Sequence, residues 1–160
     1  LQIPSSIVCA GTYPPAANNM IFKSISSVRT IVKPLENRSV VVSEPVLFQE
    51  FCQGSNIRVH CLSDMYSATK IETDAVDYRY AKSKLTYNYH LPPKIAEECL
   101  NIANQLKLEF TGIDLIMHRD LWTLLEVNPA PGYAFFERHD KAKSISNMLI
   151  TYFTRKTNAA

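Results

Sequence analysis

The order of the predicted elements constrains the fold more than any other feature of this chain. Runs rich in β-branched and aromatic residues fill the first half, each bounded by Ser, Pro, Asn or Gly, as is typical of strands joined by hairpins. The predicted strands are residues 20–23, 28–33, 39–42, 46–51, 56–62 and 65–72. Residues 1–20 and 73–90 carry no clear pattern and are predicted to be irregular. Strands in succession, without alternating helices, predict antiparallel sheets.

An amphipathic helix is predicted after this strand-rich half. Apolar residues recur at spacings of four, three and four positions, which indicates one buried stripe; they are Ile95, Cys99, Ile102 and Leu106. Residues 110–117 and 121–128 then form two predicted strands around a turn. A last helix is predicted to begin near Asp140, a favourable N-cap residue. The chain is therefore predicted to have an α+β fold.

Composition excludes several classes of protein. The 160 residues are 46% hydrophobic and 20% charged, which is typical of one folded domain or two small subdomains. A net charge of +2 is too small to predict a nucleic-acid partner, so a basic nucleic-acid binder is the weakest alternative. No apolar run approaches the roughly 20 residues that cross a bilayer, and we expect no membrane-spanning helix.

The four cysteines do not form a metal or redox motif, because no two of them have C-x-x-C spacing. We expect buried, reduced thiols in a cytoplasmic protein, with a disulfide pair as the alternative. The chain also lacks the glycine patterns of Rossmann and P-loop nucleotide sites.

Oxygen-bearing residues in the last two predicted strands carry the main functional signal. Side chains two apart in a strand share a face, so Glu126 and Asn128 point one way while Leu125 and Val127 point into the opposite layer. A hairpin brings Asp114 roughly opposite Glu126. Adjacent carboxylates repel each other, and magnesium, which takes a few oxygen ligands from protein, would relieve that repulsion. A solvated strand face with two ordinary acids is the alternative.

These residues resemble the metal-binding signature of the ATP-grasp superfamily. Its pattern is an Asp, eleven intervening residues, then Glu-x-Asn-Pro followed shortly by Gly, as in residues 114–132 here. Within the superfamily the chain is most similar to the ribosomal-protein glutamate ligases and the microviridin-type peptide-cyclising ligases. The resemblance implies an ATP-grasp fold in which Asp114, Glu126 and Asn128 hold magnesium that bridges the phosphates of ATP.

Further stretches extend the resemblance. The Phe-Gln-Glu-Phe-Cys run at residues 48–52 resembles the hinge whose main chain reads adenine, which implies that ATP contacts the last four of its residues: Gln49, Glu50, Phe51 and Cys52. An ordinary strand with one exposed acid is the alternative. Lys23 resembles the lysine of the phosphate-covering strand, although serines replace the usual glycines in the loop that follows. Lys70 is implied to contact ATP as well.

Two arginines complete the implied site. Arg58, in Asn56-Ile-Arg-Val, resembles the arginine of an Asp-Ile-Arg strand, although Asn replaces the usual Asp. Arg79, in Asp77-Tyr-Arg, resembles a downstream arginine motif. The resemblance implies that both act in catalysis on phosphate or an acyl phosphate, because a guanidinium can donate two parallel hydrogen bonds to such groups. A surface ion pair is the alternative for either.

The resemblance implies an ATP- and magnesium-dependent ligase that joins a carboxylate to an amine or hydroxyl through an acyl phosphate. Its substrate would be a peptide or protein. Whether the protein forms a homo-oligomer is left open. Residues 1–47 would be part of a small ATP-grasp subdomain, and residues 48–160 the C-terminal subdomain with the metal site. The N-terminal domain that usually precedes them is expected to be missing. The rival is a non-catalytic remnant that binds nucleotide or peptide.

Overall fold

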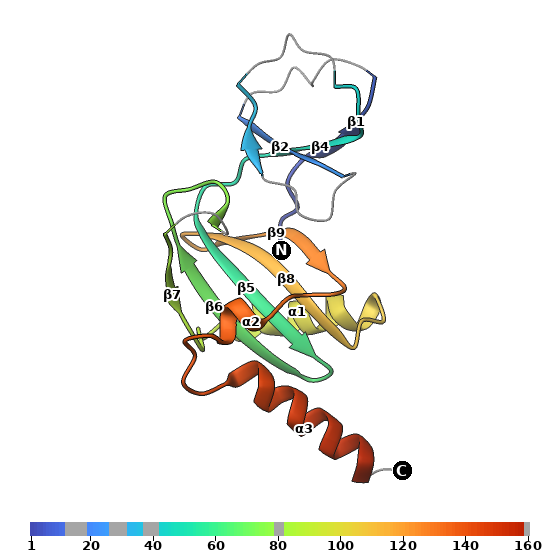
Figure 1. The fold of residues 1–160 in the computed structure, drawn as a ribbon, viewed down its shortest axis with the longest axis vertical. Helices are drawn as coiled ribbons and strands as arrows, with labels where there is room; N and C mark the ends of the chain where they lie inside the picture. The colour runs from blue at the N-terminus through green and yellow to red at the C-terminus, as the bar shows by residue number, and fades with distance from the viewer. Residues whose placement is uncertain (12–18, 26–31, 37–41, 79–81, 159–160) are drawn as a thin grey trace. The chain divides into compact units, whose positions relative to one another are not determined.

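The computed structural model describes residues 1–11, 19–25, 32–36, 42–78 and 82–158. The named strands form two antiparallel sheets, and the described helices follow late in the chain, so the predicted α+β class is confirmed (Figure 1). The chain divides into two compact units. The larger comprises Leu1–Gln2, Gly54–Glu72 and Lys84–Ala160, and the smaller comprises Ile3–Gln53 and Thr73–Ser83.

The larger unit contains a five-stranded sheet in the order β7-β6-β5-β8-β9. Its strands are β5 (Ser55–Leu62), β6 (Met65–Glu72), β7 (Lys84–Thr86), β8 (Phe110–His118) and β9 (Leu121–Asn128). The two long hairpins are confirmed, and each turns over two residues, with a positive φ at Ser63 (54°) and Arg119 (55°). The predicted irregular stretch 73–90 is wrong at β7, a three-residue edge strand that pairs with β6.

The main core lies between this sheet and α1 (Pro93–Gln105), which runs behind the sheet in Figure 1. Alternate residues of β5 point to the helix, and Ile57, Val59 and Cys61 are almost completely buried there. They meet Ile95 and Cys99 of the predicted apolar stripe. Burying one such aliphatic side chain contributes about 1.5–3 kcal/mol, so this layer holds the sheet rigid. All four cysteines are free thiols, as predicted, but only Cys61 and Cys99 are buried.

Two further helices follow, α2 (Ala134–Glu137) and α3 (Ser144–Asn158). In Figure 1 α2 lies in front of the sheet, on the face opposite α1, and α3 lies below it, where it contacts β5 and β6. The last helix begins one turn later than predicted, because the Asp140 carboxylate accepts the main-chain N–H of Ser144 (2.9 Å) and of Ala142 (3.0 Å) in the preceding turn. Ile145 and Met148 of this helix are buried. Among the described helices, none is long and apolar enough to span a membrane.

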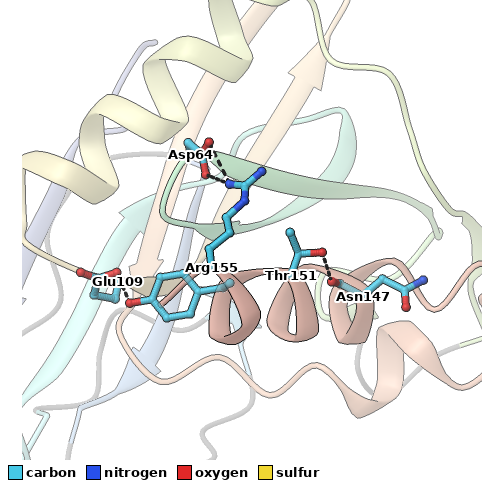
Figure 2. A network of polar contacts seen from close by, with 6 residues as sticks. Asp64, Glu109, Asn147, Thr151 and Arg155 are labelled. Carbon is cyan, nitrogen blue, oxygen red and sulfur yellow. Dashed lines mark hydrogen bonds and ion pairs between the residues drawn. The ribbon is translucent and has the colours of Figure 1, made fainter. Parts of the chain in front are cut away.

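Polar contacts connect the C-terminal half of α3 to the sheet (Figure 2). Arg155 Nη1 lies 3.0 and 3.2 Å from the two carboxylate oxygens of Asp64 in the β5–β6 turn. The hydroxyl of Tyr152 donates to Glu109 at 2.7 Å, just before β8. The exposed Arg155–Asp64 pair contributes little, about 0–1 kcal/mol, so the buried apolar residues of α3 hold it in place.

The smaller unit contains a four-stranded sheet in the order β1-β4-β2-β3. Its strands are β1 (Ser6–Cys9), β2 (Met20–Ser24), β3 (Lys33–Pro34) and β4 (Val46–Glu50). Met20, Val46 and Phe48 form its small core. The irregular prediction for residues 1–20 is wrong at β1, which pairs along the whole of its length with β4. The predicted strands 28–33 and 39–42 lie mostly outside the described residues.

The predicted boundary between residues 47 and 48 falls inside β4. This strand pairs with both β1 and β2, so all of it belongs to one sheet. The smaller unit accordingly extends to Gln53, and it also takes in Thr73–Ser83 from later in the chain.

Candidate functional site

A row of charged side chains crosses three neighbouring strands of the larger sheet. Arg58 on β5 is paired in register with Asp114 on β8, which is paired with Glu126 on β9. In the next row that shares this face, Gly112 of β8 lies opposite Asn128 of β9. The structure therefore brings the three predicted metal ligands together on two adjacent strands, with one predicted catalytic arginine beside them. Their role as ligands stays a prediction.

A β-bulge in β9 creates this register. Next to the turn Leu115 pairs with Leu124, yet the adjoining Asp114 pairs with Glu126, so Leu125 is the inserted residue. Without the insertion Asp114 would lie opposite Leu125, and Glu126 would turn to the α1 side of the sheet, because side chains alternate along a strand. Leu124 packs against the core. The prediction that Leu125 points regularly into that layer is corrected: it is the bulged residue.

Arg58 is held in an almost completely buried position, with 8% of its surface exposed. Its Nη1 donates to Asp114 Oδ2 at 2.9 Å, and its guanidinium carbon lies 5.4 Å from the centre of the Phe136 ring. The absence of a side chain at Gly112 makes room for it, since a Cβ there would lie 2.8 Å from Nη1. The arginine therefore balances the charge of the Asp114 carboxylate.

Asn128 is anchored by two hydrogen bonds at the end of β9. Its side-chain Oδ1 accepts the main-chain N–H of Ala130 at 2.9 Å, and its main-chain carbonyl accepts the hydroxyl of buried Thr111 at 2.7 Å. An amide oxygen has two lone pairs, so Oδ1 can still accept a second interaction. The turn after the strand thus fixes the side chain without using up its oxygen.

This donor set suits magnesium. The ion takes carboxylate and amide oxygens and usually draws only a few ligands from protein. Asp114 and Glu126 are acids placed directly opposite each other, an arrangement that like charges disfavour and a divalent cation would relieve. Glu126 is exposed and Asp114 partly so, which leaves the oxygens accessible. In the described part of the chain no three His, Cys, Asp or Glu residues group as metal ligands, so the amide of Asn128 is needed to complete the set.

His60 also lies next to this site. The sequence alone does not indicate this position for the histidine. Its side chain is completely buried between the rings of Phe110 (centres 6.1 Å apart) and Phe136 (5.1 Å). Burial above all, and then the charge of Arg58, lower the pKa of His60 to about 3, while the Gly132 backbone acts in the opposite sense. Neither ring nitrogen makes a hydrogen bond of normal geometry to the described residues. The imidazole is therefore neutral at physiological pH.

Lys70, a predicted ATP-binding residue, does not lie with Arg58 and the predicted metal ligands in the larger unit. It pairs with Ile57 of the core, whereas Arg58 pairs with Thr69, so Lys70 lies on the opposite face of the sheet from Arg58. Its ammonium group donates to Glu72 at 2.9 Å on the same strand. Arg79 and the serine-rich loop after Ser24 lie outside the described residues, so the structure says nothing of the predictions for them.

The other predicted ATP-binding residues belong to the smaller unit. Lys23 pairs with Leu47 and Gln49 with Ile21, so their side chains share the face of the sheet away from Phe48 and the core. The Gln49 amide donates to the hydroxyl of Ser6 at 3.1 Å. Lys23 and Gln49 are thus brought together on one face of this sheet.

The predicted hinge, residues 48–52, begins in β4 and continues two residues beyond the end of this strand. The main-chain N–H groups of Glu50 and Phe51 donate to the carbonyls of Ser5 and Asn19, both at 2.9 Å. These two amides are already satisfied, so a base read by this main chain would use other groups of residues 49–52. Burial, and next the charge of Glu50, raise the pKa of the Cys52 thiol.

Comparison with known proteins bears on this site. Residues 1–132 match the profile of the ATP-grasp domain. A search of curated proteins found no match. Among solved structures, the ATP-grasp ligase PsnB in complex with a precursor variant, Mg and ADP superposes with a TM-score of 0.73 at 24% identity, covering 94% of this chain and 53% of that one.

Two other ligases give the same picture. A RiPP-associated ATP-grasp ligase from Chryseobacterium gregarium, bound to ADP and a leader and core peptide, has a TM-score of 0.74 at 17% identity, with 97% of this chain and 55% of that one covered. The macrocyclase MdnC from Microcystis aeruginosa MRC, bound to the precursor peptide MdnA, has a TM-score of 0.68 at 17% identity, with 94% and 56% covered.

These likenesses concern the fold, and the chain spans about half the length of the solved ligases it matches. The family profile covers most of the chain, including the strands that carry Arg58, Asp114, Glu126 and Asn128. The resemblance inferred from those residues is thereby confirmed at the level of the family. This chain belongs to the ATP-grasp family.

Proposed function

We propose that this chain is the nucleotide- and magnesium-binding part of a ligase that uses ATP to join a carboxylate to an amine or hydroxyl. The observation that carries the proposal is the register of Arg58, Asp114 and Glu126 across three strands, with Asn128 in the adjacent row. These are a cation and three oxygen donors on one face of the sheet, the groups that a magnesium-bound polyphosphate requires.

The proposed reaction has two steps. A carboxylate oxygen of the substrate attacks the γ-phosphorus of ATP, which forms an acyl phosphate and releases ADP. The amine or hydroxyl then attacks the acyl carbon, phosphate leaves, and the nucleophile's proton passes to phosphate or water. In-line phosphoryl transfer depends mainly on positioning and charge neutralisation, so no protein nucleophile is required.

The roles of the residues follow from their contacts. Asp114, Glu126 and Asn128 would hold magnesium, which when bound supplies positive charge to the phosphates. Arg58 orients Asp114 through its 2.9 Å ion pair, and a guanidinium beside the site stabilises charge on transferred phosphate oxygens. In the smaller unit, Lys23 and the residues at the end of β4 would bind the phosphates and adenine. Arg79 is proposed to assist Arg58, and Lys70 remains the weakest assignment because it lies on the opposite face of its sheet.

A peptide or protein is the proposed carboxylate substrate. Support comes from PsnB, MdnC and the Chryseobacterium gregarium ligase, each of which was solved with a precursor, leader or core peptide. Two of these structures also contain ADP, and one contains Mg, which supports ATP and magnesium as cofactors.

Calorimetric titration with ADP, with and without magnesium, tests the proposal. Wild type should bind ADP more tightly when magnesium is present, and the double variant Glu126→Ala/Asn128→Ala should lose this enhancement while keeping its fold. Asp120→Ala is the matched control, because this acid lies exposed in the turn of the same hairpin. If the double variant responds to magnesium as wild type does, the metal assignment is wrong. Magnesium-dependent binding without any release of ADP from ATP, across a panel of acidic peptides, would instead identify a nucleotide-binding remnant.

A further inference from the structure

We propose that Phe136 is a positioning residue for Arg58. Together with Gly112 and Pro131 it forms a clamp, here called the Arg58 clamp, that holds the guanidinium in the orientation needed beside Asp114. The inference rests on the proposed function, because it assigns to the clamp the task of presenting Arg58 to phosphate oxygens. Phe136 itself is not placed in contact with the nucleotide.

The clamp restrains the guanidinium from several directions. The Phe136 ring lies 5.4 Å from its central carbon, within the range of a cation–π contact. A Cβ built on Gly112 would lie 2.8 Å from Nη1 and 3.3 Å from Cζ, which shows how closely the guanidinium approaches the β8 backbone. The same position is 2.8 Å from Pro131 Cβ, so the proline closes the space beside the arginine. The same Nη1 donates to Asp114.

Such a restraint is valuable for a long side chain. A free arginine samples many rotamers, and ordering it at the moment of reaction would oppose catalysis. Groups that stabilise a transition state work best when neighbouring contacts already fix them. The clamp supplies this order in advance, in a place where only 8% of the arginine surface is exposed.

Neighbouring residues hold the Phe136 ring of the clamp in place. His60 packs edge-on against the Phe136 ring at 5.1 Å, on the same face of β5 as Arg58. It remains neutral because burial disfavours its charged form, so no second cation forms next to the guanidinium. Glu137 follows Phe136 directly and is anchored to α3, since its carboxylate accepts the main-chain N–H of Ser146 at 2.6 Å. The ring is therefore held by its contact with His60 and by the anchoring of the next residue to α3.

The chain also connects the clamp to a proposed metal ligand. Asn128 ends β9, its side chain caps the following turn at Ala130, and the chain then passes through Pro131 to α2. A single short segment thus carries both the ligand amide and the ring that orients the arginine. This arrangement couples the geometry of the two groups.

The variant Phe136→Leu tests the clamp, because it keeps a large apolar side chain but removes the aromatic face. Phe135→Leu is the matched control, since Phe135 is half exposed and touches the Phe136 ring rather than the arginine. Phe136→Tyr should restore the aromatic contact. In the first measurement, ¹⁵N NMR follows hydrogen exchange of the Arg58 Nε–H, which is buried and without an acceptor among the described residues. The exchange rate should rise at least about tenfold in Phe136→Leu and change little in the other two variants.

The second measurement is the affinity for the magnesium complex of AMP-PNP, a non-hydrolysable ATP analogue. Phe136→Leu should weaken binding on the order of tenfold, Phe136→Tyr should restore it, and Phe135→Leu should stay within about twofold. Faster exchange of the Nε–H without loss of affinity would overturn the positioning role. Unchanged exchange would overturn the clamp itself. If wild type fails to bind the complex at all, the proposed function fails and the positioning role falls with it, a result distinct from either of the others.

Discussion

The substitution Gly112→Ala tests the packing of the site at a single atom. The added methyl group would lie 2.8 Å from Arg58 Nη1 and 2.8 Å from Pro131 Cβ, well inside van der Waals contact. Arg58 is confined by Asp114 and Phe136, and Pro131 is a rigid ring, so neither can move away freely. We expect the methyl group to displace the guanidinium and lengthen its 2.9 Å bond to Asp114.

The expected cost can be estimated from these contacts. Overpacking a filled interior typically destabilises by about 1–3 kcal/mol. For a chain of this size each kcal/mol lowers the melting temperature by about 2–4 °C, so a cost near 2 kcal/mol corresponds to roughly 4–8 °C. Gly132→Ala is the matched control, because a Cβ at that glycine meets no atom within 4 Å. The control should melt within about 2 °C of wild type, since alanine there adds no clash.

Fluorescence of the single tryptophan is a suitable assay. Trp122 is buried in the core of the same unit, so its emission reports the unfolding of the part that contains Gly112. Gly112→Ala should shift the thermal and urea transitions downwards, and Gly132→Ala should not. Equal transitions for the two variants would show that the arginine does not lie over Gly112, and the description of the site would be wrong.

Three further predictions concern other parts of the larger unit. The pKa of His60 is about 3 in the folded chain, against an ordinary value near 6.5. As the pH falls below 6.5 the unfolded chain binds a proton that the folded chain does not, so the free energy of unfolding decreases. Urea titrations should show that wild type loses about 2 kcal/mol more than His60→Leu between pH 7.5 and pH 5. Burial raises the pKa of both Cys61 and Cys99 to about 12, so a thiol reagent at pH 8 should label these two only after unfolding, whereas the partly exposed Cys9 and Cys52 should react in the folded chain. In thermal melts, Met148→Ala should cost about 2–5 kcal/mol and Asp64→Asn less than about 1 kcal/mol, because α3 is held by its buried face.

The long hairpins and α1 could be predicted from the sequence because their signals are local. The strand pair 56–62 and 65–72 alternates around a two-residue turn, and the stripe from Ile95 to Leu106 repeats with the period of a helix. The pairing of Asp114 with Glu126 was also predictable in outline, because both acids lie at similar distances from the turn. Spacing therefore brings the two acids together, and the resemblance to ATP-grasp enzymes is what assigns them to magnesium.

Other features depend on contacts between distant residues. The bulge at Leu125 leaves no mark in the sequence, since Leu124 and Leu125 are equally apolar and either could face the core. β1 and β7 are short edge strands, and the neighbouring strands β4 and β6 supply their hydrogen bonds. The contacts of Phe136 with His60 and with Arg58 join residues more than 70 positions apart. No local pattern could show them.

An anomalous difference map from crystals soaked with Mn²⁺ and ADP would test the central claim most directly. Manganese accepts the same oxygen ligands as magnesium and scatters anomalously, so it marks the position of the metal. We predict one peak within about 2.5 Å of oxygens from Asp114, Glu126 and Asn128, in contact with the phosphates of ADP. A well-occupied peak at the phosphates that none of these three side chains touches would contradict the account.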